Sequence, residues 1–312
     1  MAWRSGPCWA SAGGARGLRA DLPAGSVVRR DNNVAGILLI VAAVTCFSGL
    51  DATAKWTSQT LPPIATVAVR YISALLFISA LCRPWARPQI VRSRAPFLQV
   101  GRALALVGAT VCSFTSLHYL PLGQVTAISF AAPLIVAVLA GPMLNEWPGP
   151  HRIGAVIVGF GGVLVVTRPG GGMHPAVFVA LLTALMNAIY IITTRRLAGR
   201  DRPLTTLFWS GMVGAAAVSP VLPFVWMEPP GVVWAAMAGM GALATLGHYL
   251  MILAYERAQA STLAPSSYTQ LVGATLIGWA VFGDVPDIWT IIGGAIVGAS
   301  GLYLLWRGQS LA

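Results

Sequence analysis

The chain carries one pattern twice, and the two copies are almost the same distance apart at each landmark. Each copy starts at a tyrosine, continues through an uncharged apolar run to an acidic turn that contains proline, and ends in a glycine-rich apolar run. Tyr119 and Tyr255 are 136 positions apart, and the acidic residues Glu146 and Asp284 are 138 positions apart. Solenoid and propeller repeats are only roughly 20–50 residues long. The pattern therefore predicts a duplicated unit of the kind found in membrane transporters.

Composition places the chain in a membrane. Charged residues make up 9% and hydrophobic residues 56%, with a mean hydropathy of +0.74. A soluble domain carries about 25% charged residues. The net charge of +11 could indicate a nucleic-acid partner, but the arginines lie between apolar runs and form no patch interleaved with aromatic residues. We therefore expect the lipid bilayer, and no nucleic acid, as the partner of the surface.

Ten apolar runs are long enough to cross a hydrocarbon core of about 30 Å. They fall at about 34–54, 63–82, 100–118, 122–143, 152–167, 174–194, 203–225, 232–254, 260–282 and 288–306. Their length and their lack of alternation favour helices over barrel strands. The predicted fold class is an all-α integral membrane protein with ten transmembrane helices.

Basic residues are distributed unevenly between the two sides that ten spans define. One side holds Arg4, Arg16, Arg19, Arg29, Arg30, Arg83, Arg87, Arg92, Arg94, Arg102, Arg152, Arg195, Arg196, Arg200, Arg202, Arg257 and Arg307. The other side holds only Lys55 and Arg168, and Arg70 lies within the second span. Because loops rich in Lys and Arg stay in the cytoplasm, both termini are predicted to be cytoplasmic, in a bacterial inner membrane.

The two copies are predicted to be inverted relative to each other. Residues 34–168 and 174–307 would each form a repeat of five spans, and two successive units with an odd number of spans must lie in opposite orientations. The loop charges agree, because the loop between spans two and three is rich in arginine and its counterpart between spans seven and eight has none. Residues 1–33, rich in Gly, Ala, Ser and Arg, are expected to form a disordered basic cytoplasmic tail.

The acidic turns and the helices that follow them resemble the drug/metabolite transporter superfamily, in particular its EamA-type ten-helix members. The turns are Asn-Glu-Trp-Pro at residues 145–148 and Gly-Asp-Val-Pro at residues 283–286, each followed by a glycine-rich run. The likeness covers about residues 34–307, and the region from Leu263 to Asp284 is similar to the riboflavin and S-adenosylmethionine carriers. The resemblance implies a central cavity between the repeats, peripheral fifth and tenth helices, and alternating access.

Polar residues within the spans indicate where a cavity lies, because such groups are costly in lipid unless they are paired or hydrated. Span one places Asp51 and Lys55 on one face, where they can pair, either as a charge pair at the outer mouth of a cavity or as a structural pair near the membrane interface. Arg70 in span two needs a carboxylate, carbonyl groups or water, and Asp51 is a possible partner. It serves either as an anion-binding or gating residue or as a structural anchor.

Spans six and nine carry further polar groups. Thr183, Asn187, Tyr190 and Thr194 form a stripe at helical spacing, which either lines a cavity or bonds neighbouring helices. Span nine is the most polar, and Pro265 frees a backbone carbonyl near its polar cluster. The predicted cavity-lining, substrate-binding residues are Asp51, Arg70, Gln124, Ser129, Asn187, Tyr190, His248, Ser267, Tyr268 and Gln270. Tyr268 and Gln270 are the preferred substrate contacts, and His248 is either a proton relay or a buried structural histidine.

The sequence favours a secondary transporter of a small organic metabolite. Uptake of riboflavin is one candidate activity, and export of amino acids or drug-like metabolites is the alternative. An intramembrane enzyme is disfavoured, because the chain has no GxSxG or HExxH motif and no paired membrane aspartates. We expect no catalytic residues, no metal site and no cofactor, and the sequence leaves the oligomeric state, the direction of transport and the coupling ion open.

Overall fold

A computed structural model describes residues 33–144, 149–170, 173–197, 200–257, 263 and 266–309. The first half contains α1 (Asn33–Thr57), α2 (Pro63–Cys82), η1 (Pro88–Ile90), α3 (Pro96–Tyr119), α4 (Leu122–Ser129), α5 (Ala132–Leu144) and α6 (Pro150–Thr167). The second half contains α7 (Ala176–Leu197), α8 (Pro203–Val218), η2 (Ser219–Val221), α9 (Leu222–Val225), α10 (Gly231–Arg257), α12 (Thr269–Phe282) and α13 (Ile288–Gln309). The predicted tail, apart from its last residue, lies outside the described residues.

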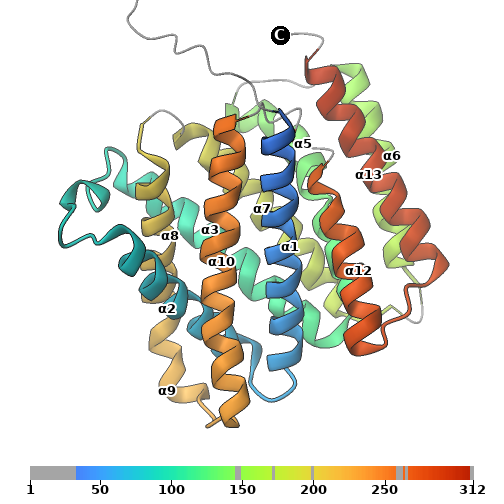
Figure 1. Ribbon diagram of the computed structural model, residues 1–312. Helices are drawn as coiled ribbons and strands as arrows, with labels where there is room; N and C mark the ends of the chain where they lie inside the picture. The colour runs from blue at the N-terminus through green and yellow to red at the C-terminus, as the bar shows by residue number, and fades with distance from the viewer. Residues whose placement is uncertain are drawn as a thin grey trace, which may run out of the picture. The chain divides into compact units, whose positions relative to one another are not determined.

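The all-α membrane fold is confirmed. Seven described helices are long and apolar enough to span a membrane, and the three shorter apolar helices at 153–167, 269–282 and 288–303 complete the predicted ten. Several spans begin at a proline in the first turn, where its missing N–H is not needed. Figure 1 shows that α1 begins at the end of the bundle where α10 and α13 finish, as an even number of crossings requires.

The outside of this bundle is apolar. Large hydrophobic side chains are exposed on separate helices, among them Leu38 on α1, Leu76 on α2, Ile157 on α6, Phe178 on α7 and Val281 on α12. A soluble protein rarely exposes so much contiguous apolar surface. The apolar faces are therefore the surface that contacts lipid.

Helix packing repeats itself when the two halves are exchanged. The helix α1 packs against α10 and α12, and its counterpart α7 packs against α3 and α5, which are the counterparts of α10 and α12. The contact of α2 with α10 is likewise mirrored by that of α8 with α3. In addition, α2 contacts its own counterpart α8, and α6 contacts α13 at one edge of the bundle (Figure 1). Such exchange symmetry is that of two repeats related by a twofold axis, as in inverted-repeat transporters.

Spans four and nine are both interrupted, at equivalent positions. Span four breaks between α4 and α5, because Pro133 lacks an N–H and its ring crowds the carbonyl one turn earlier. In span nine, Tyr268 lies in the turn before α12. Tyr268 is 138 positions after Phe130, which lies in the break of span four, and the two rings stack with centroids 4.7 Å apart. The two breaks therefore meet between the repeats, whereas Pro265 lies outside the described residues.

The helices α6 and α13 approach each other through glycines. A Cβ atom on Gly162 would lie 2.9 Å from the Gly293 carbonyl oxygen, and one on Gly293 would lie 2.8 Å from the Val166 backbone nitrogen. Real Cβ atoms essentially never come this close to backbone, so only glycine permits this crossing. Small residues serve the same purpose in other membrane helix pairs.

We expect Gly162→Val to destabilise the protein by about 2–3 kcal/mol, because the new side chain forces α6 away from α13. The adjacent Gly161→Val is the matched control, since a Cβ atom there meets nothing within 4 Å. The measurement is the temperature of half-aggregation of the detergent-solubilised protein. Equal midpoints for the two variants would contradict the close crossing.

One acidic residue ties a loop of the first repeat to a loop of the second. Asp201 accepts hydrogen bonds from the Arg94 N–H at 2.8 Å, from Gln99 Nε2 at 2.9 Å and from the Ser93 hydroxyl. Partial burial alone would raise the pKa of Asp201. These hydrogen bonds and the charge of Arg94 outweigh burial and lower the pKa below its ordinary value of 3.8.

We expect Asp201→Asn to lower stability at neutral pH and to remove part of the stability change in acid. The folded pKa is lower than the unfolded one, so the contribution is complete above the unfolded pKa of about 3.9 and is lost as the pH falls through the folded pKa. Thermal midpoints at pH 7, 4 and 3 measure this, with the exposed Glu228→Gln as the control. An unchanged thermal midpoint of Asp201→Asn at pH 7 would contradict a stabilising role for the hydrogen bonds of Asp201.

Candidate functional site

A cavity of about 390 Å³ lies between the repeats. Its wall is built by α1, α2, α3, α4, α5, α7, α10 and the start of span nine, so both halves of the chain contribute. Most of the wall is apolar, including Phe47, Phe114, Leu117 and Phe130. A mostly apolar cavity of this size with a few polar groups is typical of small-molecule sites.

Most of the predicted site residues meet at this wall. The structure brings together Asp51, Arg70, Ser129, Asn187, Tyr190, His248, Ser267 and Gln270. These residues come from six spans, so only the packing of distant helices assembles them. Their role in substrate binding stays a prediction.

Asp51 lies on the cavity wall without an ion-pair partner in the described part of the chain. It accepts one long hydrogen bond, 3.5 Å from Gln270 Nε2, and the Gln270 carbonyl in turn accepts from the Ser48 hydroxyl at 3.3 Å. The possible pairing of Asp51 with Lys55 is wrong, because Lys55 instead forms an ion pair with Asp284. Helical spacing permitted a pair between Asp51 and Lys55, but tertiary packing brought the carboxylate of Asp284 to Lys55 instead.

Arg70 is buried, and its guanidinium has few hydrogen-bond partners. Only 6% of the residue is exposed, and its guanidinium carbon lies 4.6 Å from the centre of the Tyr71 ring. Its Nε atom is buried without a hydrogen-bond partner, and no carboxylate of the described residues lies within 4 Å of the guanidinium. The suggested pairing with Asp51 is therefore absent as a direct contact, although the two side chains line the same cavity and their opposite charges attract each other across it.

Arg102 is a second buried arginine, although it was predicted to lie with the basic residues of the cytoplasmic side. It is 5% exposed and donates to the hydroxyls of Thr194 at 2.7 Å, Ser210 at 2.7 Å and Tyr190 at 2.8 Å. Pro96 was the signal that could have revealed this, because proline favours the first position of a helix and places the start of the third span about one turn before the predicted residue 100, which puts Arg102 well inside the helix.

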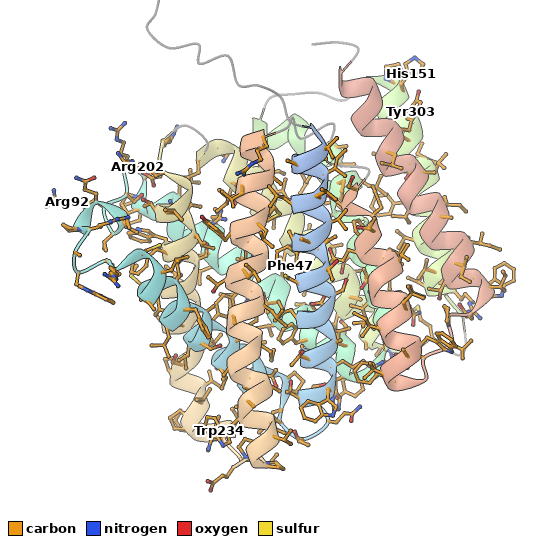
Figure 2. The ribbon with its side chains drawn as sticks, viewed as in Figure 1. Phe47, Arg92, His151, Arg202, Trp234 and Tyr303 are labelled. Carbon is orange, nitrogen blue, oxygen red and sulfur yellow. The ribbon has the colours of Figure 1, made fainter. Side chains whose placement is uncertain are left out.

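His248 and Asn187 both line the cavity, and no hydrogen bond of either side chain is present among the described residues. The His248 ring packs edge-on against Phe47, with centroids 5.0 Å apart, and Figure 2 shows Phe47 midway along α1. The α3 residues Thr110 and Ser113 also reach the wall and were missed, because hydroxyl groups within an apolar run give only a weak signal.

Two predicted residues lie elsewhere. Gln124 donates to the Val166 carbonyl at 3.4 Å and faces a separate, smaller pocket. Tyr268 lies behind Phe130, and its hydroxyl occupies the space left by Gly301 on α13. The geometry thus places Tyr268 against the peripheral helix, where it supports Phe130, and not in the wall of the cavity.

One end of the bundle beyond the cavity is held by an ion pair between the repeats. Lys55, one turn past Asp51 on α1, pairs with Asp284 and donates to the Leu120 carbonyl at 3.3 Å. Asp284 also accepts from the Leu122 N–H at 3.3 Å. The two charged side chains are 12% and 21% exposed, so this contact is partly shielded from solvent. It joins the ends of α1, α3 and α12 to the start of α4.

The apolar exterior, the duplicated fold and the cavity shared by both halves are typical of a multi-pass membrane transporter. The chain belongs to the EamA-like transporter family, whose model matches residues 34–168 and 174–307. Within the described residues no cluster of three or more His, Cys, Asp or Glu side chains could hold a metal ion.

Relatives with different named substrates match most of the chain. An S-adenosylmethionine uptake transporter of Rickettsia conorii is 24% identical, over 87% of this chain and 92% of the relative. A riboflavin transporter of Rhizobium johnstonii is 26% identical, over 87% and 91%. A pseudopaline exporter of Pseudomonas aeruginosa is 26% identical, over 84% and 93%. A solved crystal structure with 18% identity and a TM-score of 0.63 covers 89% of this chain and shares its fold.

Proposed function

We propose that this protein is a secondary transporter that takes up a small organic metabolite across the bacterial inner membrane by alternating access. The observation that carries the proposal is a central cavity lined by both repeats, with an inter-repeat ion pair beyond one of its ends. Rocking of one repeat against the other would expose such a cavity to each side in turn.

The proposed orientation has both termini in the cytoplasm, which the arginine-rich loops support. The end carrying Lys55 and Asp284 then faces the periplasm. On α1 the cavity wall runs from Ile40 to Asp51, which is the middle of the helix. The cavity therefore lies near the middle of the bundle, and in the proposed orientation the Lys55–Asp284 ion pair closes its periplasmic side.

Riboflavin and S-adenosylmethionine are the substrates to test first, because transporters of each are relatives of this chain. Aromatic rings in the wall, such as Phe47 and Phe130, suit the planar ring that both molecules carry. Export is the alternative direction, because one relative is named as a pseudopaline exporter.

Uptake into proteoliposomes tests the proposal. Labelled riboflavin and S-adenosylmethionine are supplied separately outside vesicles that contain the protein, and initial rates are compared with empty vesicles. Ser129→Phe, which fills the cavity, is expected to reduce uptake at least tenfold. Val138→Phe on the exposed face of α5 is the matched control and should transport normally. Equal uptake by full and empty vesicles, for both compounds and in both directions, would refute the proposal.

A further inference from the structure

We infer that the cavity binds a zwitterion, with a carboxylate of the transported molecule on Arg70 and a cationic centre, ammonium or sulfonium, on Asp51. This inference rests on the proposed transport function and narrows its substrate class. It favours metabolites that carry an α-amino-acid group over neutral ring compounds. The two charges stand in one cavity wall, yet they form no ion pair with each other.

Arg70 is the anion-binding half of the site. A buried guanidinium is costly unless anions or several hydrogen bonds replace its water. Arg102 meets that requirement with three hydroxyl groups of α7 and α8, at 2.7–2.8 Å. Arg70 is equally buried, but its Nε has no partner and it faces the cavity. The contrast indicates that the missing partner of Arg70 comes from outside the protein, and a carboxylate matches the planar guanidinium best.

Asp51 is the cation-binding half. A carboxylate offers about four acceptor sites, and Asp51 uses one of them for a long hydrogen bond from Gln270. The nearest lysine along α1, Lys55, is occupied by Asp284 and the Leu120 carbonyl. No Lys, Arg or His nitrogen of the described residues lies within 4 Å of the Asp51 carboxylate. A cationic group of the substrate would supply the missing partner.

A substrate that carries an anionic and a cationic group can pair with Arg70 and Asp51 at once, whereas an uncharged substrate can form an ion pair with neither residue. Riboflavin is uncharged at neutral pH, so its entry would leave Arg70 and Asp51 unpaired while displacing water from them. S-adenosylmethionine carries a carboxylate that can pair with Arg70 and two cationic centres, an ammonium and a sulfonium, one of which can pair with Asp51; its aromatic nucleoside suits the rings of the wall. Complementary buried charges discriminate strongly against partners that leave them unpaired.

The test measures binding of S-adenosylmethionine, of its carboxyl methyl ester and of riboflavin to the purified protein by isothermal titration calorimetry. For the wild type, S-adenosylmethionine is expected to bind at least tenfold more tightly than its methyl ester or riboflavin. Arg70→Gln should remove this preference over the ester, and Asp51→Asn should weaken binding of both cationic probes at least tenfold. Arg92→Gln, an exposed arginine at the edge of the bundle in Figure 2, is the matched control.

The comparison of zwitterion and ester on the wild type needs no variant, so misfolding of a mutant cannot obscure the result. Equal affinity for the two would overturn the role of Arg70. Uptake into proteoliposomes distinguishes failure of the zwitterion site from failure of the proposed transport function. Uptake of riboflavin without uptake of S-adenosylmethionine, unchanged in Arg70→Gln, would leave transport standing and overturn the zwitterion site. Uptake or release of none of the probes would refute the proposed function itself.

Discussion

Lys55→Glu is expected to reduce transport at least tenfold, and the double variant Lys55→Glu/Asp284→Lys to restore most of it. The single change places two carboxylates where an ion pair joins the repeats. Two like charges about 4 Å apart repel by about 4 kcal/mol at an effective dielectric constant of 20. That exceeds the roughly 1–3 kcal/mol that typically couples conformational states, so the conformation closed at this end would be depopulated.

Initial rates of uptake in proteoliposomes measure the loss and its rescue. Labelling adds a structural readout, with Leu117→Cys on the cavity wall of an otherwise cysteine-free protein. A membrane-impermeant maleimide added from the Lys55 end should react faster when Lys55→Glu is present. The pair formed by Arg168 and Asp287 is the control, because its side chains are 49% and 43% exposed. Its charge reversal should change transport little, as exposed ion pairs contribute little. Failure of the double variant to recover any transport would contradict the ion-pair mechanism.

Arg102→Met is expected to destabilise the protein by about 2–4 kcal/mol, because it removes three charge-assisted hydrogen bonds that hold α3 to α7 and α8. The loss is less than three full bonds, since the hydroxyls of Thr194 and Ser210 still donate to carbonyls one turn earlier in their own helices. The temperature of half-aggregation in detergent should fall by roughly 5–10 °C.

Arg102→Lys tests geometry as well as charge, because an ammonium cannot match the three directions of a guanidinium, and we expect it to recover only part of the loss. The exposed Arg92→Met should leave the midpoint unchanged. Transport by Arg102→Met should also fall, because the Tyr190 hydroxyl that Arg102 holds belongs to a residue of the cavity wall. A midpoint like that of the wild type would show that Arg102 is a topological residue, as its place in the sequence first indicated.

The fold was largely predictable because membrane helices are defined by local composition. Each run of apolar residues must satisfy its own backbone within the helix, so its length and position can be read from the sequence alone. The break at Phe130 was less evident, although Pro133 was its cause. The start of the third span was set by Pro96, about one turn earlier than the apolar run implied, so Arg102 lies more than one turn inside α3 and is buried.

The site was predictable only in part. Polar residues within apolar spans indicated a cavity, and Asp51, Asn187 and His248 do line one. Sequence could not give the rotation of each helix about its axis within the bundle. Tyr268 and Gln270 are two positions apart, yet Gln270 reaches the cavity and Tyr268 packs toward α13 behind Phe130.

The sequence by itself determined the membrane location, the ten spans, the two repeats and, from the odd number of spans in each, their inverted relation. These features depend on local hydropathy and on a period that can be counted. Only the tertiary structure decided which charges meet. Lys55 pairs with a residue 229 positions away and not with Asp51 on its own helix face, and this leaves Asp51 and Arg70 unpaired in one cavity. Such contacts depend on how distant helices pack and rotate, which no local pattern encodes.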